Sequence, residues 1–257
     1  MKRKLIAGNW KMYKTQQETV AFMDQLNLDQ WPGDKVDAVI CPSYLAIPVL
    51  AANQRLIENR IFLGAQDGHP TKEGAYTGAI SMNMVLAAGC RYVIVGHSER
   101  RQLFGETDIQ VRDKVLQALS VGLVPILCVG ETKAQRDSGE TETVIRFQIS
   151  EALADIKAVA PEVLVIAYEP VWAIGTGTPA TAADAMIVNT LIRDEVVKLG
   201  VCRDVAALRI LYGGSVKPDN IGIFLQEQGI DGALVGGASL DPLQFREMVD
   251  HAAGMVT

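Results

Sequence analysis

Eight short apolar runs recur along the chain, and their spacing constrains the fold more than any other feature of the sequence. Their first residues lie 23 to 45 positions apart, which leaves room for one helix between successive runs. Each run is apolar throughout, as is typical of parallel strands that are covered on both faces. The runs occupy residues 4–9, 37–42, 61–66, 91–96, 123–129, 163–168, 208–213 and 231–236.

The intervals between the runs have the pattern of helices, with apolar residues at spacings of three and four and charges between them. The expected helices cover residues 16–26, 82–88, 108–119, 142–156, 182–199 and 243–252. Residues that favour the start of a helix are Thr107, Thr141 and Asp241 with Pro242. Glycines that favour the end of a helix are Gly89, Gly122 and Gly200.

Eight such units favour an α/β fold, a single closed (β/α)8 barrel of eight parallel strands ringed by helices. No shift in composition and no Pro/Ser-rich linker divides the chain, so one domain over residues 1–257 is expected. An open doubly wound sheet is the alternative. Its dinucleotide-binding glycine pattern is missing after the first run, where the sequence reads Gly8-Asn9-Trp10-Lys11.

Composition and charge exclude several classes of function. The net charge is −6, which argues against nucleic acid or an anionic membrane as a partner. No window approaches the roughly 20 apolar residues of a membrane span, and the apolar stretch after Met-Lys-Arg-Lys stops at Asn9, too early for a secretory leader. The four cysteines form no CxxC pair, so neither a zinc knuckle nor a disulfide framework is indicated. The expected location is the cytoplasm.

Polar residues gather where the runs end, which in a barrel is where the active site forms. These residues are Asn9, Lys11, Gln66, Asp67, His97, Ser98, Glu99, Cys128, Glu131, Glu169, Gly213, Gly214, Ser215, Gly236 and Gly237. Each alone has an ordinary explanation, because a lysine or glutamate after a strand is commonly solvated and a lone histidine is commonly packed. Closure of a barrel would bring all of them together.

Three glycine segments, at 175–177, 213–215 and 236–237, offer main-chain N–H groups without bulky side chains. Oriented N–H groups at the last two strands of a barrel form an anion site, so a ligand of the size of a sugar phosphate is expected. The three histidines, His69, His97 and His251, belong to no Asp/Glu/His cluster with the spacing of metal ligands, so no metal is expected.

Lys11, His97 and Glu169 are then left to act on the other end of the ligand. A carboxylate base, a hydrogen-bond donor and a fixed cation fit abstraction of a proton next to a carbonyl group. No cofactor motif supports hydride transfer. Acyl transfer needs a positioned nucleophile, for which Ser98 and Cys128 are weak candidates.

At these residues the chain resembles the triosephosphate isomerase family over essentially its full length. The matching segments are GNWKM at 8–12, GAYTG at 74–78, VGHSERR at 95–101, FGETD at 104–108, CVGE at 128–131, AYEPVWAIGTG at 167–177, YGGS at 212–215 and VGGA at 235–238. The resemblance implies interconversion of dihydroxyacetone phosphate and D-glyceraldehyde 3-phosphate through an enediolate, without a cofactor, in glycolysis and gluconeogenesis.

The resemblance also assigns roles by position. Glu169 is implied as the base and His97 as the electrophile, with Lys11 and Asn9 against the substrate. The implied phosphate-binding residues are Gly175, Ser215, Gly236 and Gly237, and the implied supporting residues are Ser98, Glu99 and Cys128. Residues 170–180 are implied to close over the phosphate.

His97 is expected to be a neutral imidazole, for which this family is a standard example. The sequence adds a local reason, because residues 98–101 look like a helix start and the positive end of a helix dipole disfavours a second positive charge.

Two positions depart from the family pattern. Thr178-Pro179 stands where the family commonly has lysine and then threonine or valine, so the trailing end of the lid is expected to have fewer open conformations. Ala79 stands where the family usually has glutamate, within a long turn-rich segment, residues 67–81. In the family this segment reaches into a second subunit, so a homodimer is implied, with one polar contact fewer.

Two other functions stay open. A Schiff-base aldolase needs a desolvated lysine at a strand end, for which Lys11 is the candidate. An inactive barrel that senses sugar phosphates would bind without turnover, but it would need no base such as Glu169.

Overall fold

In a computed structural model of the chain, which describes residues 2–174 and 180–255, eight parallel strands close into a barrel. Each strand pairs with the next, and β1 pairs with both β2 and β8, which closes the ring. The strands are β1 Lys4–Asn9, β2 Val36–Cys41, β3 Ile61–Ala65, β4 Tyr92–Val95, β5 Val124–Val129, β6 Val165–Tyr168, β7 Arg209–Tyr212 and β8 Gly232–Val235. The predicted barrel is confirmed, with every strand within two residues of its predicted bounds, and the open sheet is wrong.

The strand interiors are almost entirely apolar because both faces of the strands are buried, and the charged exceptions Asp37 and Arg209, near the amino ends of β2 and β7, pair with one another at 2.8 Å. In β1, Leu5 and Ala7 point into a core inside the barrel, whereas Ile6 belongs to a second core between the strands and the helices. Parallel strands covered in this way have no solvated face on which a polar residue would be favoured. Polar side chains are therefore tolerated at the strand ends.

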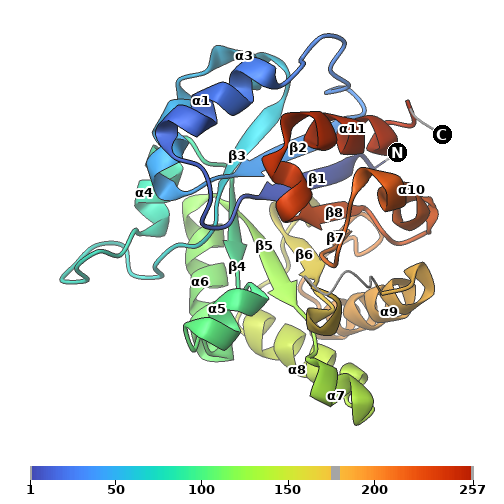
Figure 1. Ribbon diagram of the computed structural model, residues 1–257. Helices are drawn as coiled ribbons and strands as arrows, with labels where there is room; N and C mark the ends of the chain where they lie inside the picture. The colour runs from blue at the N-terminus through green and yellow to red at the C-terminus, as the bar shows by residue number, and fades with distance from the viewer. Residues whose placement is uncertain (1, 175–179, 256–257) are drawn as a thin grey trace.

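Helices ring the barrel on the outside (Figure 1). The longer ones are α1 Gln16–Gln25, α4 Met82–Ala87, α5 Ser98–Leu103, α6 Asp108–Val121, α8 Thr141–Leu153, α9 Ala182–Leu199, α10 Pro218–Gln226 and α11 Pro242–Ala252. The short elements are α2 Ile47–Ala51, α3 Gln54–Glu58, α7 Lys133–Asp137 and the 3₁₀ turns η1 Tyr44–Ala46, η2 Pro161–Val163, η3 Val171–Ala173 and η4 Gly237–Leu240. All six predicted helices are present. Among the described residues, none of the helices is long and apolar enough to cross a membrane.

Most of the predicted helix boundaries are confirmed by local contacts. Thr107 caps α6 through a capping box with Gln110, and the side chain of Asp241 accepts two backbone N–H groups at the start of α11. Gly122 and Gly200 end α6 and α9 in the left-handed conformation. The prediction for Thr141 is wrong: α8 starts at Thr141 itself, and neither its hydroxyl nor Glu140 caps the helix. Glu140, at the N-cap position, has ψ 3° instead of the extended backbone typical of a capping residue, and its side chain accepts no N–H of the first turn.

The segment between β3 and α4 projects away from the barrel (Figure 1). Its base is closed by the backbone bond from His69 N to Ile80 O at 2.7 Å.

Candidate active site

A cavity of about 350 Å³ opens at the carboxyl ends of the strands. It is lined by Asn9, Lys11, His97, Glu169, Ile174, Gly213, Gly214, Ser215, Val216, Lys217, Leu234, Gly236, Gly237, Ala238 and Gln244. Nine of the residues that the sequence places at the ends of the runs are among them. The barrel thus brings together groups that are up to 228 positions apart, from Asn9 to Gly237.

His97 and Glu169 face one another in this cavity, and both side chains are buried. His97 Nε2 lies 2.9 Å from Glu169 Oε1, and the backbone N–H of Ser98 donates to Glu169 Oε2 at 2.9 Å. His97 follows β4 and is the N-cap of α5, where its Nδ1 accepts the N–H of Glu99 at 3.2 Å. Glu169 follows β6, and its backbone N–H donates to Val129 O at 2.8 Å. Strand ends and a helix start therefore place both groups.

The two groups shift one another's ionisation. Burial alone would raise the pKa of Glu169, but the positive charge of protonated His97, its hydrogen bond and the Ser98 N–H hold that pKa below its ordinary value. Burial alone would lower the pKa of His97, but the negative charge of Glu169 outweighs it and raises that pKa. The contact with Glu169 favours a protonated His97 ring and so opposes the neutral imidazole expected from the sequence. The Glu99 N–H favours the neutral ring, because a Nδ1 that accepts a hydrogen bond carries no proton.

Lys11 enters the cavity from the end of β1 with an unusual backbone. Its φ is 52°, a left-handed conformation that is uncommon for residues other than glycine. Two side chains hold it: Gln66 Nε2 donates to Lys11 O at 2.8 Å, and Asn9 Oδ1 accepts the Lys11 N–H at 3.0 Å. The Lys11 ammonium lies 2.6 Å from Glu99 Oε1. Glu99 Oε2 also lies 3.7 Å from His97 Nδ1, and Glu99 itself does not line the cavity.

The opposite end of the cavity is built from glycine-rich backbone. Gly213, Gly214 and Ser215 follow β7, and Gly236 and Gly237 follow β8 at the start of the 3₁₀ turn η4. Backbone N–H groups at such turns and helix starts bind anions. Gly175 and the departure Thr178-Pro179 lie outside the described residues.

Glu169 has neighbours without side chains on both sides. A Cβ at Gly130, after β5, would lie 1.7 Å from Glu169 O, and a Cβ at Gly213, after β7, would lie 2.9 Å from Glu169 Cγ. Neither position accommodates any larger residue without displacing Glu169.

Comparison with known proteins identifies the family of the chain. The family model described as Triosephosphate isomerase matches residues 4–252. The chain belongs to this family. Proteins named Triosephosphate isomerase are 45% identical in Chloroflexus aurantiacus over 251 residues (98% of this chain, 100% of the relative), and 47% identical in Herpetosiphon aurantiacus over 249 residues (97% and 99%). One from Roseiflexus sp. is 48% identical over 252 residues, 97% of each chain.

Behind Glu169 lies a second, smaller cavity of about 180 Å³, which Ser98, Cys128 and Glu169 help to line. Burial raises the pKa of the Cys128 thiol well above its ordinary value, and the charge of Glu169 adds to this. Cys128 is thus held as a thiol, which is a poor nucleophile. In this member of the triosephosphate isomerase family Ser98 contributes its backbone N–H, not its hydroxyl, to Glu169.

Glu131 is a residue whose role the sequence did not reveal. It is fully buried, and its Oε1 accepts from Tyr168 OH at 3.1 Å and from Trp172 Nε1 at 2.9 Å. Arg136 lies over the Trp172 ring at 4.1 Å and 3.8 Å from Glu131 Oε1. These contacts anchor Trp172, near the start of the segment 170–180 for which the resemblance implies closure. The available signal was a carboxylate two positions after the apolar run 123–129.

Lys217 and Gln244 also line the cavity and were missed. Lys217 follows Gly-Gly-Ser-Val directly, a spacing that could have indicated it, whereas Gln244 lies in a helix 28 positions from Val216 and gives no such signal. Among the described residues, no three His, Cys, Asp or Glu side chains stand close enough to hold a metal ion.

Proposed function

We propose that the chain interconverts dihydroxyacetone phosphate and D-glyceraldehyde 3-phosphate in the cavity at the carboxyl ends of its strands. An isomerase acting on triose phosphates follows from membership of the family and from the names of its relatives. The reaction moves one proton between neighbouring carbons, and it belongs to glycolysis and gluconeogenesis. The observation that carries the site assignment is the contact of Glu169 with His97 in one cavity with Lys11 and the glycine-rich turns.

In this proposal Glu169 is the base that takes the proton from C1 or C2 and returns it to the other carbon. It must first leave the Ser98 N–H and the His97 ring, both at 2.9 Å. These two contacts lower the pKa of Glu169, so breaking them leaves burial as the dominant influence and makes the carboxylate a stronger base. The same movement that brings it to the substrate therefore increases its basicity.

His97 is the electrophile that donates from Nε2 to the carbonyl oxygens. Once Glu169 turns to the substrate, the larger of the two carboxylate charges that raise the His97 pKa moves away, and that of Glu99 remains. Burial and the Glu99 N–H at Nδ1 then favour the neutral ring. Lys11 supplies a fixed positive charge for the enediolate oxygen and the phosphate. Asn9 lies against the substrate and holds the Lys11 backbone.

The phosphate is held at the glycine-rich end by backbone N–H groups of Ser215, Gly236 and Gly237, and by Gly175, which lies outside the described residues. Glu99, Ser98 and Cys128 have supporting roles: Glu99 orients Lys11, Ser98 holds the resting Glu169, and Cys128 packs behind it.

A coupled assay on glyceraldehyde 3-phosphate, with deuterium uptake into product measured in D₂O, tests this assignment. Glu169→Asp keeps the charge but withdraws the carboxylate by a methylene, so kcat should fall by roughly 100-fold. Glu247→Asp, on the exposed face of α11, is the matched control and should keep the wild-type rate. Wild-type kcat in Glu169→Asp, or no deuterium in the product, would refute the assignment. An aldolase would form a Schiff base between the substrate and Lys11, which borohydride would reduce and trap. In an isomerase, borohydride should trap no substrate on Lys11.

We also propose that the chain forms a homodimer through residues 67–81. The projecting segment borders a hollow of about 420 Å³ together with Tyr44 and Phe104. Tyr76 of this segment is 50% exposed, and Phe104, which ends α5 beside the hollow, is 70% exposed. Met12, in the loop after β1, is 96% exposed. Exposed apolar groups of this kind are typical of interaction sites.

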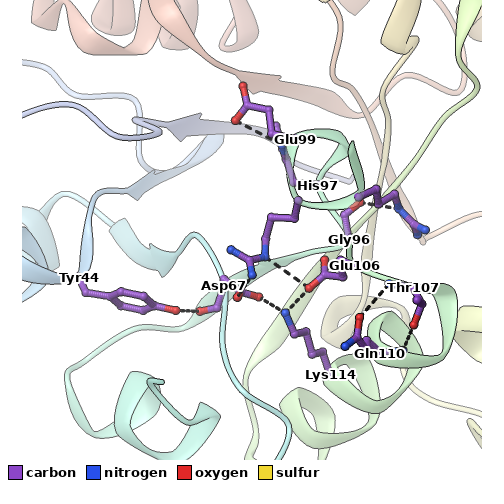
Figure 2. A network of polar contacts seen from close by, with 11 residues as sticks. Tyr44, Asp67, Gly96, His97, Glu99, Glu106, Thr107, Gln110 and Lys114 are labelled. Carbon is purple, nitrogen blue, oxygen red and sulfur yellow. Dashed lines mark hydrogen bonds and ion pairs between the residues drawn. The ribbon is translucent and has the colours of Figure 1, made fainter. Parts of the chain in front are cut away.

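A polar network connects the base of this segment to the elements that follow His97 (Figure 2). Lys114 of α6 contacts Asp67 Oδ1 at 2.6 Å and also Glu106, and Arg100 of α5 lies 3.1 Å from Asp67. Tyr44 OH donates to Asp67 O at 2.6 Å. A partner that binds the segment would therefore stabilise α5, the helix whose N-cap is His97.

The cytoplasm is the location that we propose. The four cysteines, Cys41, Cys90, Cys128 and Cys202, are buried and unpaired, as is usual in a reducing compartment. Fractionation of cells that express a tagged chain would test it, and recovery outside the cytoplasmic fraction would contradict it.

A further inference from the structure

Lys217 lies at the phosphate end of the cavity, and the roles above leave it unused. It follows the turn after β7 and is the N-cap of α10, where its backbone N–H donates to Asn220 Oδ1 at 2.8 Å. Its side chain is exposed and lines the same cavity as Ser215 and Gly236. Asp219, in the first turn of α10, does not line the cavity.

The other charged side chains that line the cavity are already paired. Lys11 Nζ lies 2.6 Å from Glu99, and His97 lies 2.9 Å from Glu169. Within residues 2–174 and 180–255, the Lys217 ammonium forms no ion pair with a carboxylate. Residues 175–179, Gly-Thr-Gly-Thr-Pro, carry no charged side chain. No described carboxylate therefore neutralises the positive charge of Lys217 at the edge of the cavity.

An approaching triose phosphate is a dianion, and the chain carries a net charge of −6 that repels it. The backbone N–H groups of the glycine-rich turns act only near contact, because the field of a dipole falls off faster than that of a charge. An ammonium group acts over about a Debye length, roughly 8 Å at physiological ionic strength. Local charge at the mouth of a cleft raises the rate at which a charged ligand is captured.

We infer that Lys217 is a capture residue, whose ammonium draws the substrate phosphate to the glycine-rich end of the cavity and raises kcat/KM without acting in the chemical step. The inference rests on the proposed function and deepens it, because it assigns substrate capture to a residue separate from those that hold or transform the substrate.

The test measures kcat and kcat/KM on glyceraldehyde 3-phosphate from about 0.01 to 0.5 M ionic strength. Lys217→Gln should lower kcat/KM roughly three- to tenfold at the lowest salt, change kcat less than about twofold, and approach wild type at the highest salt. Lys217→Glu should lose more, and Lys217→Arg should restore wild-type capture because it keeps the charge.

Two controls separate capture from folding. Lys35→Gln removes the same charge at an exposed position next to the amino end of β2, at the opposite end of the barrel, and should leave kcat/KM unchanged. Proton exchange into glyceraldehyde without phosphate should be equal in wild type and Lys217→Gln, whereas a folding defect would lower it.

The outcomes also separate this inference from the proposed function. A wild-type chain without isomerase activity would refute the function itself. An active wild type with an unchanged low-salt kcat/KM in Lys217→Gln would overturn the capture role alone. A loss of kcat that is equal at all salt concentrations would overturn it as well, because it would place Lys217 in the chemistry.

Discussion

Glu169 remains ionised in a fully buried position largely because of one neighbour. Its pKa is below the ordinary 4.5 because the charge and hydrogen bond of His97 outweigh burial, with help from the Ser98 N–H and Lys11. A group with a depressed pKa stabilises the folded state above its unfolded pKa and loses that contribution as the pH falls through its folded pKa. The acid limit of both activity and stability should therefore depend on His97.

Replacing His97 with Gln tests this dependence. The cation is lost while burial stays, so the pKa of Glu169 should rise and the acid limb of the kcat/KM profile should move to higher pH. The same change should lower kcat by roughly 10²–10⁴-fold, the usual contribution of acid–base assistance. The measurement is a pH–rate profile of wild type, His97→Gln and the matched control His251→Gln on α11. An acid limb in His97→Gln that coincides with wild type would show that another group holds the pKa of Glu169 down.

The side-chain pairs of the site could not be predicted, although most of its members could. Residues at strand ends are predictable, since a barrel collects them, and Asn9, His97 and Ser215 were found in that way. The pairing of Lys11 with Glu99, 88 positions apart, depends on the positive φ of Lys11 and on rotamers that no local pattern records. Lys217 was missed because it lies five residues after the end of β7, farther along than the residues that directly follow a strand.

At the scale of elements, helix caps give a direct comparison between two threonines. Thr107→Ala removes a capping box at α6 and should lower the free energy of unfolding by about 1 kcal/mol. Thr141→Ala changes a residue inside the first turn of α8 that caps nothing, so the change should stay within about 0.5 kcal/mol.

Urea unfolding of both variants measures this difference through the shift in midpoint at constant slope. Equal losses in the two variants would mean that the hydroxyl of Thr107 contributes nothing specific to α6.

Element length decided which parts of the fold the sequence could predict. All eight strands were found because each is a compact apolar run between turns, and α9 was found because 18 residues give several periods of a helical pattern. The elements α2, α3 and α7 have five residues each, less than two turns, so no periodicity identifies them. The helix α10 was missed although Pro218 opens it, because Gly222 interrupts its pattern.

At the scale of the whole molecule, the projecting segment 67–81 and its apolar neighbours make assembly testable. Phe104→Asp should shift the chain towards monomer at micromolar concentration, because a carboxylate would have to be buried in the interface without a partner. Ile187→Asp, at a similarly exposed position on α9, is the matched control and should leave the association state unchanged.

Sedimentation velocity over a range of concentrations gives the association state, and the coupled assay gives activity for the same samples. A wild-type chain that sediments as a monomer at micromolar concentration with full activity would refute the dimer.

The two glycines beside Glu169 limit how such a barrel can be recombined with its relatives. Gly130, Glu169 and Gly213 directly follow β5, β6 and β7. The three residues fit together only because neither glycine has a side chain. A chimera that inherits β6 from one parent must inherit glycine at both flanking positions as well. The smallest transferable unit of this site is therefore a block of three consecutive strands.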